Sequence, residues 1–370
     1  MRLDIPIAYF NHAGLSRPEA SVTERMRAAE QEYREQLFSE AGVEMYYATL
    51  HECRSAVADL LGVAGPGGVS LVANATTAIQ ILLSALGASL APGATILTSD
   101  QEHPCVVRPL NMLAARGVEV IMIAASSAAE MLARIEEQVS AKRPGLVILS
   151  HVSYKNGRVL PVVEVGALLA RDAIPYIVDG AQALGHIAVD VPAMGAWAYA
   201  FSGHKWIGGP WGTGGLWASE QLAAHNRFTL SNWADKHDPP AGGRYEGGTM
   251  NYALIAGLAE ACRQARATLA TRMRGLSRTQ TAIRRRLEGI FPDADPTWND
   301  GHAPGIVAYL MGPQLDSWTL AAWMLRNHGV AIKPFRPPER PDAIRISYSS
   351  STPVAGVERL AAALRKEASR

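Results

Sequence analysis

The stretch WAYAFSGHKWIGGPWGTGGLWAS, residues 197–219, contains two apolar runs separated by a glycine-rich link. The first run, 197–205, and the second, 212–219, have the length and composition of buried strands. The link is too short for a helical crossover, so we expect one of the two strands to be antiparallel. His204 and Lys205 end the first run, at the position where the strands of an open sheet present residues to ligands.

Five further apolar runs precede this stretch. They occupy residues 68–73, 94–100, 118–125, 145–153 and 175–182. Helical segments with apolar residues at spacings of three and four lie between the early runs. Apolar strands separated by helices predict an α/β fold with a mainly parallel, seven-stranded sheet covered on both faces.

The character of the sequence changes after about residue 250. A long helical stretch rich in Ala, Arg and Leu runs from Tyr252 to about Ile290, and short strands and two helices follow it. We therefore predict an N-terminal segment near the active site (1–20), a large domain (21–250) and a small C-terminal α+β domain (251–370).

The composition is typical of a globular protein. Of 370 residues, 48% are hydrophobic and 19% charged, and the formal net charge is +1. This balance gives no bulk attraction to nucleic acid or to an anionic membrane. No apolar run is long enough to cross a bilayer, and the first residues lack an apolar signal core. The sequence thus predicts a cytoplasmic protein with neither nucleic acid nor membrane as partner.

The three cysteines, Cys53, Cys105 and Cys262, are far apart in the sequence. Their number and spacing form neither a disulfide framework nor a metal-binding pattern. We interpret them as reduced, small apolar residues and predict no metal site.

Polar residues follow several of the predicted strands. Thr76 and Thr77 open a helix after the run 68–73, where a helix N-terminus either binds an anion such as phosphate or is simply capped. His103 lies just past the run 94–100 and is either a polar loop residue or a group that stacks on a planar ring. Taken singly, none of these residues defines a function.

Two more strand ends carry stronger signals. Asp179 ends an apolar strand, and its carboxylate there needs a cation or several donors, for which a protonated ring nitrogen or an arginine would serve. Lys205 lies among Phe201, Trp206 and Ile207, so partial desolvation would lower its pKa and make the amine a nucleophile or base. The glycines follow Lys205 rather than precede it, which argues against a nucleotide phosphate loop.

These groups together form the set that pyridoxal phosphate requires. The set comprises a lysine amine for the aldehyde, an acid for the ring nitrogen and a site for the phosphate. A nucleotide-binding enzyme, or a regulator that has kept the fold without catalysis, are the rival interpretations.

The sequence also resembles the class V aminotransferase and cysteine desulfurase superfamily, which are fold-type I pyridoxal phosphate enzymes. The resemblance rests on VDGAQALG (178–185), on AFSGHKW (200–206) and on the 26 residues from Asp179 to Lys205. Further motifs occur in the family's order over nearly the whole chain: YFNHAG, NATTAI, QEHPCVV, SHVSYKNGRVLPV, YEGGTMNY and IRISYSSSTP.

The resemblance implies how the cofactor would be held. Lys205 would bind it covalently, Asp179 would pair with the ring nitrogen and Gln182 would contact the ring hydroxyl. His103 would stack on the ring, so that Lys205, His103 and Asp179 are the expected catalytic residues.

The resemblance also implies a phosphate site and a homodimer. The phosphate would be held by Thr76, Thr77, Ser202 and His204. Thr249 would reach the phosphate of the neighbouring subunit, so that the two active sites of the dimer are shared.

On the substrate side, the resemblance implies that Arg345 binds the α-carboxylate of an amino acid. A guanidinium can hold a carboxylate through two parallel hydrogen bonds. Asn11, His12 and Tyr154 are the other expected pocket residues. The loop KPFRPPERPDA (333–343) lacks the cysteine that desulfurases carry there, so desulfurase chemistry is not expected.

Among members of the superfamily, the motifs are most similar to cyst(e)ine C–S lyases and isopenicillin N epimerase-like proteins. We therefore expect β-elimination on cysteine, cystine or an S-substituted cysteine. An aminotransferase, an epimerase or a decarboxylating deaminase, acting on an amino acid or a cysteine conjugate of secondary metabolism, is the alternative.

Overall fold

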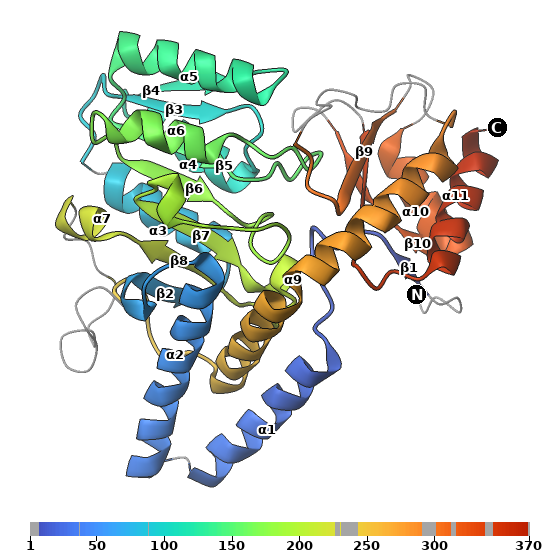
Figure 1. Cartoon of the computed structure of the whole chain (residues 1–370), viewed down its shortest axis with the longest axis horizontal. Coiled ribbons are helices and arrows are strands. Elements are labelled where there is room, and N and C mark those ends of the chain that lie inside the picture. Colours follow the sequence, from blue (N-terminus) through green and yellow to red (C-terminus); the bar gives the residue numbers. More distant parts are fainter. Residues whose placement is uncertain are drawn as a thin grey trace.

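The computed structural model describes residues 7–36, 38–87, 89–225, 230, 243–290, 301–311, 316–336 and 343–368. Two main sheets organise the described part of the chain, and a third sheet has only two short strands (Figure 1). A large sheet with helices on both faces takes up the first two thirds, and a small antiparallel sheet packed against helices takes up the rest.

The large sheet has seven strands, as the sequence predicts. Their order across the sheet is β2-β8-β7-β6-β5-β3-β4. The strands are β2 (Val69–Val72), β3 (Thr95–Ser99), β4 (Glu119–Ile123), β5 (Leu146–Ser150), β6 (Tyr176–Asp179), β7 (Ala198–Ser202) and β8 (Gly214–Ala218). Each lies inside one of the seven apolar runs, so the strand prediction and the α/β fold are confirmed.

The strand β8 is antiparallel to both of its neighbours, β7 and β2. All other pairs in the sheet are parallel. The expected reversal is therefore confirmed, and its cause is the short link between β7 and β8. Gly215 is required at this crossing, because a Cβ there would come within 2.6 Å of the Ser70 carbonyl oxygen and the Phe201 ring.

Helices cover both faces of the large sheet (Figure 1). On one face α3 (Ala75–Gly87), α4 (Pro104–Ala114) and the short α7 (Glu220–His225) pack their apolar side chains against the strands. On the other face the packing comes from α2 (Glu40–Leu61), α5 (Ala128–Lys142), α6 (Val162–Ala170) and the first part of α9 (Tyr252–Leu287). Short 3-10 turns occur at Pro66–Gly68 and Pro192–Met194.

The small sheet has the order β11-β12-β9 and is antiparallel. Its strands are β9 (Ile306–Leu310), β11 (Lys333–Phe335) and β12 (Ala343–Ser347), and the helices packed with them are α10 (Ser317–His328) and α11 (Val354–Ala368). The N-terminal strand β1 (Ala8–Tyr9) pairs in parallel with β10 (Val330–Ala331). The chain start is thereby attached to its C-terminal part.

Helix α9 (Tyr252–Leu287) connects the two parts of the molecule. Its first half, from Ile255 to Ala265, belongs to the core under the large sheet, and its second half, from Leu276 to Leu287, belongs to the core of the small sheet. The first half also packs on α1 (Ala20–Gln36) and α2. The domain boundaries at residues 20 and 250 stay a prediction, because this helix enters both cores.

Among the described residues, no helix is both long and apolar enough to span a lipid bilayer.

Candidate active site

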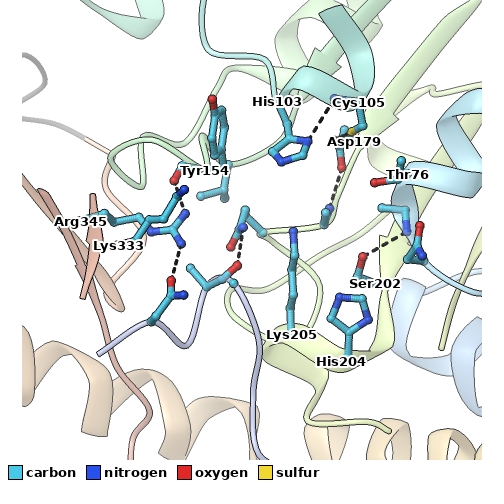
Figure 2. A pocket seen from close by; sticks show the side chains of 18 residues that line it. Thr76, His103, Cys105, Tyr154, Asp179, Ser202, His204, Lys205, Lys333 and Arg345 are labelled. Carbon is cyan, nitrogen blue, oxygen red and sulfur yellow. Dashed lines mark hydrogen bonds between the residues drawn. The ribbon is translucent and has the colours of Figure 1, made fainter. Parts of the chain in front are cut away.

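A cavity of about 430 Å³ lies where the strand ends of the large sheet meet the small sheet and the N-terminal segment (Figure 2). This volume is within the usual range for small-molecule sites. Ten of the residues singled out from the sequence line it: Asn11, Thr76, His103, Tyr154, Asp179, Gln182, Ser202, His204, Lys205 and Arg345. The cavity is therefore the natural place to test the predicted roles.

Lys205 lies in the turn Gly203–Ile207, which follows β7 directly, and its own backbone angles (φ −105°, ψ −121°) are not helical. Burial lowers the pKa of its amine, and the charge of Arg345 lowers the pKa further. The carboxylate of Asp179 acts in the opposite direction. A desolvated amine of this kind is more readily deprotonated than a surface lysine and can act as nucleophile or base.

Asp179 is the last residue of β6 and is 4% exposed. Its Oδ1 accepts a hydrogen bond from the backbone N–H of Ala181 at 2.9 Å, and the Sγ of Cys105 lies 4.0 Å from its Oδ2. Burial raises the pKa of this carboxyl, while the Ala181 bond and the charge of Lys205 lower it. A cationic ring nitrogen in the cavity would compensate the desolvation of the carboxylate.

The opposite end of the cavity is built from the start of α3 and the end of β7. Ser202 Oγ accepts a hydrogen bond from the N–H of Ala75 at 3.0 Å, which joins these two elements. Asn74 Oδ1 accepts a bond from the N–H of Thr77 at 2.9 Å and thereby caps the helix. Thr76 lines the cavity and Thr77 does not, so at Thr77 the structure shows the capping arrangement.

His204 supplies a direct indication of a ligand at this end. Its Nδ1 is buried and has no hydrogen-bond partner among the described residues. Buried polar atoms are nearly always partnered, by protein, water or ligand. Burial, followed by the charge of Lys205, lowers the pKa of His204, while a hydrogen bond to the Thr213 backbone raises it. With the other ring nitrogen donating to Thr213, Nδ1 can donate to a phosphate oxygen only when the ring is protonated, and the charge of the phosphate would favour that form.

His103 begins α4, and its Nδ1 accepts a hydrogen bond from the N–H of Cys105 at 3.1 Å. Burial lowers the pKa of the imidazole to about 3, with further contributions from Lys205, Arg345 and Lys333. Since Nδ1 accepts, the neutral ring carries its proton on Nε2. The ring lies over the cavity, edge-on to Tyr154 at 4.8 Å between centroids (Figure 2).

The side of the cavity away from His204 carries Arg345 (Figure 2). Its Nη1 donates to the Tyr154 carbonyl oxygen at 2.7 Å, and its Nη2 donates to Asn11 Oδ1 at 2.8 Å. Arg345 is 3% exposed and comes from β12. Three predicted substrate residues thus form one hydrogen-bonded group, drawn from the N-terminal segment, the loop after β5 and the small sheet.

Two predicted residues, Thr77 and His12, lie outside the cavity that they were expected to line. His12 does not line the cavity, and its ring packs on Trp206 at 5.0 Å between centroids. Gln182 lines the cavity, but its Nε2 donates to the Ala13 carbonyl at 2.9 Å and its Oε1 accepts from Trp206 Nε1 at 2.7 Å, so its amide oxygen is already engaged. Thr249, which was expected to serve the neighbouring subunit's site, is exposed and lies outside the cavity of its own chain; its role stays a prediction.

Four residues that matter to the site were missed from the sequence. Asn74, Cys105 and Lys333 line the cavity. Glu102 lies behind it, 2% exposed, and its carboxyl accepts bonds from the Ser150 hydroxyl and N–H. Asn74 and Cys105 belong to motifs quoted above, so the position of each after a strand was an available signal. Glu102 belongs to the same motif as Cys105, so the signal was available there too, whereas Lys333 carried no such signal.

The fold and the cavity define a class of protein: an α/β enzyme whose buried lysine and buried aspartate face one cavity at the ends of neighbouring parallel strands. A family model, aminotransferase class V, matches residues 8–290. The chain belongs to the aminotransferase class V family. This membership confirms pyridoxal phosphate as the cofactor that the sequence predicted.

Curated relatives support the same family. The chain is 32% identical over 225 residues to a probable cysteine desulfurase of Mycolicibacterium paratuberculosis, and 31% identical over 227 residues to a cysteine desulfurase of Dickeya dadantii. The matched regions cover 57% and 58% of this chain but 32% and 54% of the two relatives. The chain thus spans about a third to about half the length of these two relatives.

Solved structures agree over the whole fold. The structure of C-DES, a cystine C–S lyase in complex with its reaction product cysteine persulfide, superimposes with a TM-score of 0.84 at 25% identity and covers 97% of both chains. The apo cysteine desulfurase of Thermococcus onnurineus superimposes with a TM-score of 0.85 at 23% identity, covering 98% of this chain and 95% of that one. The second likeness shows the fold alone.

Proposed function

We propose that this chain is a pyridoxal-phosphate-dependent C–S lyase that performs β-elimination on cysteine, cystine or an S-substituted cysteine. The observation that carries the proposal is the pairing of a complete cofactor cavity with a substrate side that has no cysteine among its described residues. The similarity to a cystine C–S lyase over the full length supports it.

The residues of the cavity fit the cofactor. The buried carboxyl of Asp179 suits the ring nitrogen, and the buried Nδ1 of His204 suits the phosphate. Ser202 and Thr76 would complete the phosphate site from β7 and α3, and the imidazole of His103 would lie against the ring. Lys205 would hold the cofactor covalently through its amine. When bound, pyridoxal phosphate withdraws electrons from Cα of an amino acid and so stabilises negative charge there.

The protein groups around the substrate then have defined tasks. Arg345, oriented by Asn11 and the Tyr154 carbonyl, would hold the α-carboxylate. The amine of Lys205, whose pKa is lowered by burial, would remove the proton from Cα. The bond from Cβ to sulfur then breaks, and the electron pair leaves with the sulfur. With the entry of one water molecule, R–S–CH₂–CH(NH₃⁺)–COO⁻ gives R–SH, pyruvate and ammonium.

The cysteines argue for elimination rather than desulfuration. Cys53 and Cys262 are buried in the core and do not line the cavity. Cys105 lies beside Asp179, on the side of the ring nitrogen, and burial raises the pKa of its thiol to about 12. A persulfide-forming nucleophile has to be a thiolate on the substrate side. None of the three cysteines meets both conditions.

The homodimer with shared active sites is part of the same proposal. Thr249 is exposed, outside its own cavity, and follows the segment that Glu246 fixes by a buried ion pair to Arg54. This placement leaves Thr249 available to a second copy. Light scattering on the purified holoenzyme would give twice the chain mass, and mixed dimers of Lys205→Ala and Thr249→Asp protomers would recover part of the activity that each variant lacks alone.

The activity test uses cysteine, cystine and S-methylcysteine with the holoenzyme. Pyruvate, ammonium and the sulfur product in equal amounts support the lyase, the sulfur product being hydrogen sulfide from cysteine, a persulfide from cystine and methanethiol from S-methylcysteine. Alanine together with protein-bound sulfur would instead identify a desulfurase. A keto acid that retains the sulfur would identify an aminotransferase, racemised substrate an epimerase, and carbon dioxide a decarboxylating deaminase.

A further inference from the structure

Lys333 and Arg345 form a pair of like charges that faces the cavity. They are directly opposite each other in the antiparallel pairing of β11 with β12, so their side chains lie on the same face of the small sheet. Both line the cavity, and Figure 2 shows both on the side away from Ser202 and His204. Like charges at directly opposite positions destabilise a sheet, so their retention at a cavity requires a compensating partner.

The described residues do not supply that partner. Lys333 forms no ion pair within the described part of the chain, and its Nζ lies over the rings of Phe335 and Trp318, at 5.3 and 5.9 Å from the centroids. Arg336, three residues further on, pairs with Asp316 through Nη2 at 2.7 Å. Within the same short segment, therefore, the surface cation is neutralised and the cavity cation is not.

The cofactor does not supply it either. Asp179 is the only described carboxylate that lines the cavity, and it is assigned to the ring nitrogen. The phosphate belongs at the end formed by Ser202 and His204, opposite the two cations. An α-carboxylate accounts for one positive charge, that of Arg345. A second positive charge, that of Lys333, is left for another anionic group.

We propose that Lys333 is a specificity-determining residue, and that the substrate is a cysteine conjugate, or a similar amino acid, whose side chain ends in a second anionic group such as a carboxylate. The proposal rests on the proposed function, since it concerns the substrate of the same cavity. The volume of about 430 Å³ has to hold the cofactor as well, so the anionic substituent on sulfur is short. The leaving group is then an acidic thiol of the mercaptocarboxylate class.

The experiment compares two amino acids of nearly equal shape, S-carboxymethylcysteine and S-carbamoylmethylcysteine, with the holoenzyme. The first carries the second charge and the second is its neutral amide. We expect kcat/KM and affinity, the latter read from the change in the cofactor's visible absorption, to favour the acid by at least about 10-fold, as a charge-assisted hydrogen bond provides. Lys333→Gln should abolish this preference.

Arg336→Gln is the matched control, because Arg336 is close in sequence but ion-paired to Asp316 and outside the cavity. It should retain the preference for the acid. The inference would be overturned if the wild-type enzyme had equal kcat/KM and affinity for the acid and the amide, or if Lys333→Gln kept the preference for the acid. Either result would leave the lyase proposal standing. If no substrate yields a thiol, the lyase proposal fails, and the relative affinity for the two compounds still decides the role of Lys333.

Discussion

Asp179 and Lys205 reach the same cavity from neighbouring parallel strands. Asp179 ends β6 and is opposite Ala200 in the register of β6 with β7, and Lys205 follows β7 by three residues. The sheet itself therefore fixes the distance between the acid and the amine. The residues between them form one crossover connection, which brings the chain back so that β6 and β7 end at the same edge of the sheet.

Replacement of Lys205 by alanine tests the covalent attachment. We expect loss of the cofactor's visible absorption, no cofactor-modified peptide after borohydride reduction, and thiol release slowed by about 10³-fold or more. Lys142→Ala is the control, since Lys142 is exposed and paired with Glu119 at 3.1 Å. A Lys205→Ala enzyme that keeps a reducible, covalently bound cofactor would contradict the assignment.

Replacement of His204 by alanine tests the phosphate end of the cavity. Loss of the Nδ1 contact should weaken pyridoxal phosphate binding by about 10-fold, which corresponds to roughly one charge-assisted hydrogen bond. Equilibrium dialysis against the apoenzyme would measure it. Pyridoxal, which lacks the phosphate, is the internal control and should bind the variant and the wild type alike. An equal loss of affinity for pyridoxal phosphate and for pyridoxal would show that His204 does not contact the phosphate.

Gln182 connects the N-terminal segment to the turn that holds Lys205. Gln182→Ala leaves the Trp206 indole N–H and the Ala13 carbonyl without their bonds, at 2.7 and 2.9 Å, inside the protein. We expect a loss of about 1–3 kcal/mol in the free energy of unfolding, measured by urea denaturation. Gln264→Ala removes an exposed bond to Ser21 and a part-buried bond to Glu260, and should change the free energy of unfolding by less than about 0.5 kcal/mol.

Arg54 and Glu246 form a buried ion pair that holds the segment before Thr249. Arg54 Nε and Nη2 donate to the two carboxylate oxygens at 3.0 and 2.6 Å, and Glu246 also accepts from the N–H of Leu71. Arg54→Ala would leave the buried carboxylate of Glu246 without its cation, so we expect the free energy of unfolding to fall by about 3–5 kcal/mol.

The exposed pair of Arg266 with Asp59, at 2.8 Å, provides the comparison. Arg266→Ala should lower the free energy of unfolding by about 0–1 kcal/mol, because water and salt screen a surface ion pair. A similar midpoint of urea denaturation for both variants would show that burial does not distinguish the two ion pairs.

Glu102 makes stability depend on pH. Burial raises the pKa of its carboxyl from 4.5 to about 7. The folded state favours the protonated acid. The contribution of Glu102 to folding stability is therefore fully present below pH 4.5 and is lost as the pH rises through about 7. The shift corresponds to about 3 kcal/mol.

Glu102→Gln resembles the protonated acid and should remove this dependence. The difference in unfolding free energy between the variant and the wild type should therefore grow in favour of the variant from pH 5 to pH 8.5. Taking the difference cancels the opposite contribution of His103, whose lowered pKa acts at acid pH. A difference that stays constant with pH would show that Glu102 ionises normally.

The strands and the cofactor end of the cavity were predictable because they depend on local signals. An apolar run followed by a polar residue marks a buried strand and its end, which located Asp179, Lys205 and Ser202. The antiparallel direction of β8 was predictable because the glycine-rich link between β7 and β8 is too short for a helical crossover.

The substrate side was less predictable because it depends on contacts between distant residues. Lys333 faces Arg345 through a strand register that no local pattern specifies. His12 follows Asn11 in the sequence, but successive residues of an extended chain point to opposite sides, so only Asn11 reaches the cavity. Gln182 lines the cavity, as expected for a residue that contacts the ring, but nothing in the sequence indicated that the Trp206 indole would engage its oxygen.

Helix α9 is about 54 Å long, given its 36 residues and a rise of 1.5 Å per residue. Between its two buried halves, Arg272 directs Nη1 at the carbonyl oxygens of Trp206 and Ile207, 3.5 and 3.4 Å away. These carbonyls belong to the turn that carries Lys205. The same helix therefore supports both cores and, through Arg272, also contacts the turn that positions the lysine.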